Sequence, residues 1–290
     1  MANLKIIADN AADRASITSS TTAGTLAAAN MLTDLKGQVH RSTGTSVSYT
    51  LTWAAFETVA GVALPACNLT ADSTIRVRGY DATIGGALVF DSGMQYAAPG
   101  PVLGQWDWSQ PLNSNAFSGA IWDWPAPRDS KSFAYGGAVK TAVWLDNAYS
   151  VKRLVVDLVD TNNAAGFIDC ARIVAGPVWS PQYNAGYGAA VSMDDGSKNS
   201  RNDGGDLLTD RFASSETLRL DLQYLPPSDR ARISQIIRST GVARPVFIAL
   251  TPGGDTLLDQ ETMVYGKRQN SPIAFSFYNA FSTNITLEGW

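Results

Sequence analysis

The sequence predicts a mainly β protein: a jelly-roll β-sandwich followed by a smaller, strand-rich α+β module. Two observations support the sandwich. About seven or eight short strand-like runs lie between Val47 and Gly176, and turns rich in Asn, Asp and Gly separate them. A third observation predicts the second module, because the pattern changes after Trp179-Ser180-Pro181 and a reliable helical spacing then follows.

The first 45 residues carry little periodic signal. Leu4–Ile7 indicates a short strand, whereas Ala11–Ala29 is rich in Ala, Ser and Thr and has too weak a period to predict an element. We interpret the second segment as an arm or loop. Residues 1–45 are therefore expected to form an N-terminal arm, or a strand associated with another module.

Residues 46–180 are expected to form the sandwich. Its clearest signal is a pair of runs, Arg153–Asp160 and Phe167–Pro177, which alternate with a period of two and are joined by an Asn/Gly turn. This pattern predicts two neighbouring strands with one buried face. Runs of β-branched and aromatic residues predict further strands at Val47–Trp53, Thr58–Leu64, Thr74–Tyr80, Ala87–Asp91 and Thr141–Leu145.

Residues 181–290 are expected to form the α+β module, dominated by strands. Ile233, Ile236 and Ile237 fall at helical spacing, with Ser228 or Asp229 as the predicted N-cap and Gly241 as the stop. Strands are predicted at Leu218–Leu225, Pro245–Leu250, Met263–Gly266, Ser271–Tyr278 and Asn284–Glu288.

Charge and apolar content exclude several classes of partner. The net charge is −4, the pI is near 5.0, and the 22 Lys and Arg residues are scattered, which disfavours a nucleic-acid partner. No run approaches the roughly 18 apolar residues of a membrane span, and the first ten residues lack an export signal. Cys67 and Cys170 could form one disulfide, but two buried free thiols are favoured for a chain made in a reducing compartment.

The motifs of common enzyme classes are missing. A Ser-His-Asp hydrolase needs a histidine as its base, and the single histidine, His40, has no G-x-S-x-G elbow to accompany it. We therefore interpret His40 as a surface or hydrogen-bonded residue and expect no enzyme activity. A glycosidase that uses two carboxylates stays an alternative, because its two acidic residues need only lie close together in the folded chain, at no fixed spacing in the sequence.

Cofactor and metal motifs are missing as well. One His and two distant Cys disfavour zinc, and neither a dinucleotide-binding loop nor a phosphate-binding loop is present, so no cofactor is predicted. The acidic segment Asp194–Asp206 could bind calcium through oxygen ligands. It lacks EF-hand spacing and contains Lys198 and Arg201, so a polar hairpin tip is favoured.

A tryptophan-rich insertion at 99–137 supplies the candidate contact residues. Two Trp-Asp-Trp triplets could combine ring stacking on a sugar with carboxylates that accept hydrogen bonds from hydroxyl groups. Alternatively, the tryptophans seal one end of the sandwich or are buried against another subunit. The residues are Trp106, Trp108, Trp122 and Trp124.

Four segments carry a resemblance to known proteins: Val62–Thr70, Ile75–Asp81, 151–176 and Leu218–Tyr265. The 151–176 pair resembles the closing strands of a discoidin-like (galactose-binding-like) jelly roll. Together the segments are similar to structural proteins encoded among the tail genes of long-tailed bacteriophages, over about four fifths of the chain from near residue 45. The resemblance implies a virion protein of the tail tip or baseplate, assembled in the host cytoplasm with other tail proteins, as a homo-oligomer in a ring. It transfers no catalytic residue.

Three hypotheses follow for the function. The first is a non-enzymatic structural subunit of a tail tip or baseplate, which predicts large subunit interfaces. The second is a receptor-binding, lectin-like module that contacts glycans of the host surface, which predicts saturable glycan binding. The third is a polysaccharide depolymerase, which predicts the release of reducing ends. The sequence favours the first.

Overall fold

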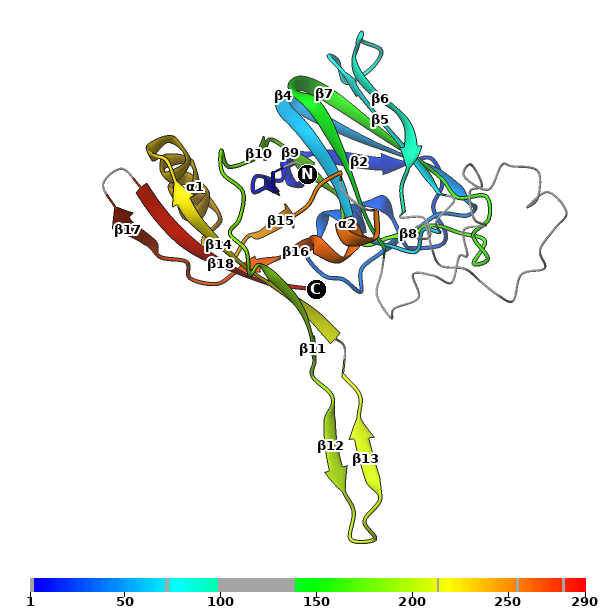
Figure 1. Ribbon diagram of the computed structural model, residues 1–290. Coiled ribbons are helices and arrows are strands. Elements are labelled where there is room, and N and C mark those ends of the chain that lie inside the picture. The colour runs from blue at the N-terminus through cyan, green and yellow to red at the C-terminus, as the bar shows by residue number, and fades with distance from the viewer. Residues whose placement is uncertain (1–2, 71–72, 99–138, 213, 254–255, 278–279) are drawn as a thin grey trace, which may run out of the picture.

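The computed structural model describes residues 3–70, 73–98, 139–212, 214–253, 256–277 and 280–290 (Figure 1). Within these residues the strands form two eight-stranded antiparallel sheets and a separate two-stranded hairpin. The prediction of a mainly β fold is confirmed. No helix in this part of the chain is long and apolar enough to cross a membrane.

The first sheet covers the part of the chain that was predicted as the sandwich. It is built on long, bent strands. Its order is β3 (His40–Arg41), β8 (Asp169–Cys170), β4 (Ser46–Cys67), β7 (Val139–Val159), β5 (Thr74–Tyr80) and β6 (Leu88–Tyr96). Two short strands also pair with β4: β2 (Ser16–Ser19) and β9 (Val174–Gly176).

Strand β4 is a single strand where the sequence predicted two. The exposed stretch 54–58 looks like a turn in the sequence, but it is a bulged bend, and the register with β7 shifts between Thr52 and Glu57. Residues on both sides of the bend, such as Leu51 and Val62, line the same core. In the same way, the runs predicted at Thr141–Leu145 and Arg153–Asp160 merge into β7. Bulges allow such bending without ending a strand.

The predicted pairing of Arg153–Asp160 with Phe167–Pro177 is wrong. The first run lies in β7, and the second is broken into β8 and β9, both of which pair with β4. Because β4 lies between them, the two runs are not neighbours. A short turn in the sequence suggested a hairpin, but the chain crosses over β4 instead.

The second sheet contains the C-terminal part of the chain together with the N-terminal strand. Its order is β10 (Val178–Trp179), β1 (Lys5–Ile7), β15 (Pro245–Ala249), β16 (Met263–Arg268), β18 (Ala280–Gly289), β14 (Ser214–Leu225) and β11 (Ala190–Asp195), with β17 (Ile273–Phe277) on β18. Helix α1 (Pro227–Thr240) packs on β14 and β18, and a short helix, α2 (Thr256–Thr262), lies near β15 and β16. The two-stranded hairpin consists of β12 (Lys198–Arg201) and β13 (Leu207–Asp210).

Helix α1 begins and ends for identifiable reasons. It ends at Gly241, whose φ of 56° is easily adopted only by glycine, so the predicted stop is confirmed. The predicted N-cap is wrong: Pro226 occupies the cap position and makes no side-chain cap bond. The Asp229 carboxylate instead accepts a hydrogen bond of 2.7 Å from the backbone N–H of Gln182.

The segment predicted as an arm or loop packs against the sandwich. It contains two short 3-10 helices, η1 (Ala11–Arg14) and η2 (Ala28–Leu32), with β2 between them. Ala11 and Ala12 are completely buried in the core of the first sheet. Small side chains let this segment lie close to the sandwich. The weak periodicity of its sequence therefore results from close packing, and the segment is not a free arm.

A third core joins the two sheets. It contains Ile7 of β1, Ala63 of β4, Phe247 of β15 and Tyr265 of β16, all at most 4% exposed. Because the second half of β4 faces the first core with one side and this core with the other, almost every residue from Val59 to Cys67 is buried. The two sheets therefore pack directly against each other.

Candidate functional site

The predicted contact residues, Trp106, Trp108, Trp122 and Trp124, lie outside the described residues. Their two interpretations, sugar contact and packing, both stay predictions. The candidate surfaces considered below belong to the described part of the chain.

His40 is a structural residue in the core. Its Nδ1 lies 2.8 Å from the Tyr49 hydroxyl oxygen and its Nε2 lies 2.9 Å from the carbonyl oxygen of Thr21. A carbonyl only accepts, so Nε2 carries the proton and Nδ1 accepts from Tyr49. Burial lowers the His40 pKa and keeps the ring neutral. The hydrogen-bonded interpretation is confirmed, although the residue is buried and not at the surface.

Cys67 and Cys170 form the predicted pair of buried free thiols. They lie opposite each other in the β4–β8 pairing, with their Sγ atoms 3.2 Å apart. Burial raises the pKa of the Cys67 thiol well above its usual value. A neutral, buried thiol is a poor nucleophile, so this pair is unsuited to covalent catalysis.

Residues 190–212 form a protruding hairpin, which we call the arm. It leaves the second sheet along β11, continues through β12 and β13, and returns into β14, extending away from the rest of the molecule (Figure 1). The turn at its end is held by Asn202, whose side chain accepts from the Asp206 N–H at 2.8 Å. The predicted polar hairpin tip is confirmed, and no group of three or more metal-ligating side chains occurs in the described residues.

The arm exposes apolar and charged side chains together. Four large apolar residues, each more than half exposed, lie along it: Met193, Leu207, Leu208 and Phe212. It also carries five aspartates and three basic residues, a net charge of −2. None of these charged groups forms an ion pair within the described part of the chain. Exposed apolar side chains gathered on one hairpin make the arm a candidate contact surface.

A small cleft of about 230 Å³ lies where β6, β7 and the segment around α2 meet. It is lined by Gln95, Ala142, Trp144, Pro252, Gly253, Asp259 and Met263. The half-buried Trp144 indole lies with its ring centroid 5.0 Å from the Lys5 ammonium group. The Asp259 carboxylate accepts from the Gly253 N–H at 2.9 Å, which fixes the rim. A tryptophan, a glutamine and an aspartate thus line one cleft.

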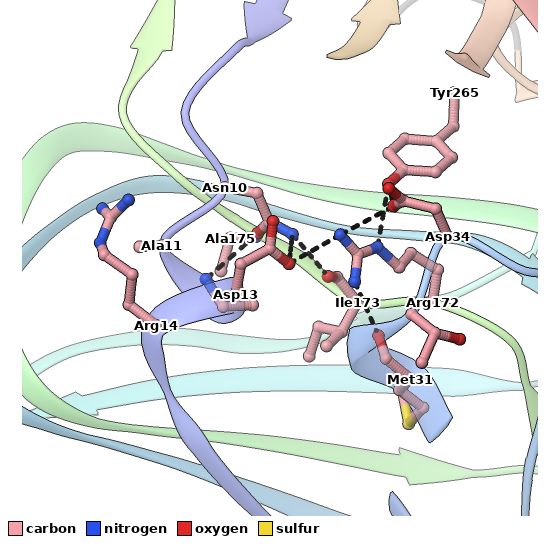
Figure 2. A network of polar contacts seen from close by, with 12 residues as sticks. Asn10, Ala11, Asp13, Arg14, Met31, Asp34, Arg172, Ile173, Ala175 and Tyr265 are labelled. Carbon is pink, nitrogen blue, oxygen red and sulfur yellow. Dashed lines mark hydrogen bonds and ion pairs between the residues drawn. The ribbon is translucent and has the colours of Figure 1, made fainter. Parts of the chain in front are cut away.

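A buried arginine ties the two sheets together. Figure 2 shows the Arg172 guanidinium between Asp13 of η1, Asp34 and Tyr265 of β16. Its Nη2 lies 2.6 Å from Asp13 Oδ1 and 3.0 Å from Asp34 Oδ1, and its Nε donates to the Tyr265 hydroxyl at 2.9 Å. That hydroxyl donates in turn to Asp34 at 2.8 Å.

The carboxylates of this cluster are held in place from the side of the N-terminal segment. The Asn10 side chain donates to Asp13 at 2.9 Å and to the carbonyl of Ile173 at 3.2 Å (Figure 2). Burial raises the Asp13 pKa, and the Arg172 charge opposes that rise. Because all three nitrogens of the Arg172 guanidinium lie within hydrogen-bond distance of a protein oxygen, we interpret the cluster as a structural clamp.

Sequence reasoning missed both the cleft and the clamp. Gln95, Trp144 and Asp259 are far apart in the sequence and share no motif, and Arg172 stands in a strand-like run as one more polar residue. An arginine at an inward position of a strand pattern was the one available signal for the clamp. The exposed apolar residues of the arm were also visible, as Leu207-Leu208 between two acidic turns.

No family model matches the sequence, and no curated protein sequence matches it. Solved structures match part of the fold. A GH29 fucosidase of Ruminococcus gnavus in complex with fucose is 10% identical with a TM-score of 0.36, covering 60% of this chain and 27% of that chain. The chain thus spans about a quarter of the fucosidase.

Two smaller structures are matched over almost their whole length. Chitosan-binding module 1 of a chitosanase/glucanase from Paenibacillus sp. IK-5 is 11% identical with a TM-score of 0.37, covering 58% of this chain and 99% of that chain. The family 32 carbohydrate-binding module of C. perfringens NanJ, in complex with galactose, is 8% identical with a TM-score of 0.35, covering 61% and 99%. Nothing in these comparisons indicates a phage tail protein.

Proposed function

We propose that this chain is a non-enzymatic assembly subunit that docks onto a neighbouring protein through its arm. The observation that carries the proposal is the arm itself, residues 190–212, whose large apolar side chains are exposed. An isolated two-stranded hairpin is only marginally stable in water. A partner that covers Met193, Leu207, Leu208 and Phe212 would stabilise it by removing apolar area from water.

The assembly that we propose is a bacteriophage tail tip or baseplate, with other tail proteins as partners and the virion as the location. The sequence resemblance supports this choice. The absence of enzyme activity is part of the proposal, and the environment of His40 supports it. Both ring nitrogens of His40 are already engaged in hydrogen bonds in the core, so this histidine is not placed to act as a general base.

Hydrogen exchange tests the proposal directly. In the isolated chain, the backbone amides of β12 and β13 should exchange fast, because their hairpin pairs with no other strand of the described chain. In assembled particles the same amides should be protected by at least about tenfold. The amides of β15, in the middle of the second sheet, serve as the internal reference. Arm amides that exchange equally fast in both states would overturn the proposal.

A second candidate function is the binding of a glycan, and the cleft favours it. Sugar sites commonly combine an aromatic side chain with a few polar groups that fix the orientation of the hydroxyls. Trp144, Gln95 and Asp259 supply this combination in a space of about 230 Å³, which suits a single sugar ring.

Calorimetric titration with neutral and amino sugars, including galactose, fucose and glucosamine oligosaccharides, tests the second candidate. Saturable binding that Gln95→Ala weakens at least about tenfold supports it. The matched control is Gln235→Ala, on the exposed side of α1 and away from the cleft. No saturable binding, or binding that Gln95→Ala and Asp259→Asn leave unchanged, excludes this cleft as the site.

A further inference from the structure

Helix α1 and the turn after it present an unpaired basic surface. Arg232, Arg238 and Arg244 are exposed and Arg230 is half-buried, and Asp229 is the only acid among them, so that residues 229–244 carry a net charge of +3. None of the four guanidinium groups forms an ion pair within the described residues. We call this surface the basic face.

Apolar groups lie beside these charges. The Arg230 guanidinium lies 4.8 Å from the ring centroid of Phe281, and Phe281 contacts Phe275 with the ring centroids 5.1 Å apart. Phe275 is 77% exposed, and Val242, at the other end of the helix, is 53% exposed. The basic face therefore has apolar patches at both ends of α1.

The arm complements this face in charge and in apolar content. It has a net charge of −2, and its aspartates are free of ion pairs within the described chain. Its exposed apolar residues could cover Phe275 and Val242. The 14-residue helix is about 21 Å long, and the nine residues from Asp195 to Asp203 span about 27 Å in extended form. One arm is therefore long enough to lie along one helix.

The arm cannot reach the helix of its own chain. Strand β14 begins at the base of the arm and ends at the start of α1, so the length of this 12-residue strand, about 40 Å, separates the base of the arm from the first turn of the helix. Figure 1 shows the arm and α1 extending from different ends of the second sheet. A contact between the two surfaces therefore requires a second molecule.

We propose that the arm of one copy binds the basic face of a second copy of this chain. This inference rests on the proposed function, because it names the partner of the arm. The contact is head-to-tail, since the arm and the basic face are different surfaces of the chain. Such a contact repeats from copy to copy and either closes into a ring or continues as a filament.

Paired charge reversals test this contact in solution. The arm variant Asp203→Lys/Asp206→Lys and the helix variant Arg232→Glu/Arg238→Glu should each self-associate at least about tenfold more weakly than the parent chain in sedimentation equilibrium. An equimolar mixture of the two variants should associate again, because the unchanged arm of one variant meets the unchanged basic face of the other, and each basic arm meets an acidic face. A chain with all four changes should also associate.

Two controls separate this contact from general effects of charge. Lys36→Glu/Lys267→Glu reverses two exposed charges outside both surfaces and should leave association unchanged. Leu208→Ser, which removes an apolar contact from the arm, should weaken self-association. Mixing it with the helix variant should restore association only as far as pairs, through the unchanged arm of the helix variant and the unchanged basic face of the Leu208→Ser chain.

The outcomes distinguish this inference from the function on which it rests. A parent chain that stays monomeric at several hundred micromolar, or variants whose mixing restores nothing, overturns the self-contact. If the arm amides are nevertheless protected in particles, the arm binds a different protein and the proposed function stands. If they are not protected, both are wrong.

Discussion

His40 makes the stability of this protein sensitive to mild acid. Burial lowers its pKa in the folded state, while the Asp169 charge and the hydrogen bond to Thr21 act in the opposite direction. The unfolded chain therefore takes up a proton near pH 6.5, whereas the folded chain takes it up only at lower pH. Below that unfolded pKa the unfolded state binds more protons, so stability falls as pH decreases.

We expect the free energy of unfolding to fall by up to about 1.4 kcal/mol per pH unit from pH 6.5 downwards, until the folded pKa is reached. His40 is the single histidine, so a slope between pH 6.5 and 5 can be assigned to it. Urea unfolding at several pH values measures this slope. His40→Gln is expected to be less stable but to lack the slope; a slope that persists in this variant contradicts the assignment.

The clamp around Arg172 predicts an unequal effect of two similar substitutions. Tyr265→Phe removes one hydroxyl and leaves the Nε of a buried guanidinium without its acceptor, which should cost about 1–3 kcal/mol. Tyr183→Phe, at a tyrosine that is 49% exposed, should change stability by less than about 0.5 kcal/mol. Urea unfolding measures both, and equal effects would show that the clamp contributes no stability.

Among the elements, β9 depends on close approach of the backbone. A Cβ at Gly176 would lie 2.1 Å from the carbonyl oxygen of Asp9, a backbone atom that cannot rotate away. Gly176→Ala should therefore destabilise by about 1–3 kcal/mol, as overpacking does. Gly44→Ala is the matched control, because nothing lies within 4 Å of its Cβ position. Thermal unfolding compares them; a Gly176→Ala chain as stable as Gly44→Ala contradicts this packing.

Local patterns predicted strands well and their partners poorly. Thr74–Tyr80 was predicted with its observed limits, because strict alternation and the turns on each side are local signals. Strands β4 and β7 were each predicted as two, because an exposed bulge and a turn look alike in sequence. The partner of Phe167–Pro177 depends on a crossover, which no local pattern records.

The candidate surfaces were predictable to different degrees. A polar hairpin at Asp194–Asp206 follows from its Asn, Asp and Gly content, and the structure confirms it. The cleft and the clamp depend on side chains that meet only after folding, such as Gln95 with Asp259 and Arg172 with Tyr265. The spacing of these residues in the sequence does not predict that they come together.

On the scale of the whole molecule, the arm should be the first site of proteolysis among the described residues. Its two strands are exposed over their whole length, and exposed hairpin ends are preferred sites of cleavage. Brief digestion with subtilisin, followed by mass spectrometry, should give first cuts between residues 196 and 211. Early cuts in β4 or β15, with the arm still intact, would contradict the exposure of the arm.

The division of the chain between residues 177 and 187 stays a prediction, which the same digestion tests at longer times. The side chain of Asn3 donates to the carbonyls of Pro181 and Gln182, so this segment is held by the N-terminus. We expect the second cuts here, with both fragments still bound to each other through the core between the sheets. Separation of the fragments on a sizing column would show that this core does not hold them.

The position of β1 also has a consequence for how the protein is made. Residues 5–7 are synthesised about 240 residues before their neighbours in the sheet, residues 247–249. Contacts between such distant residues form slowly, because a long loop must close first. The edge of β1 that pairs with β15 must therefore stay unpaired until then, whereas its other edge can pair earlier with β10. A nascent chain released near residue 240 would keep that edge open, so this part of the second sheet closes only after residues 247–249 have been made.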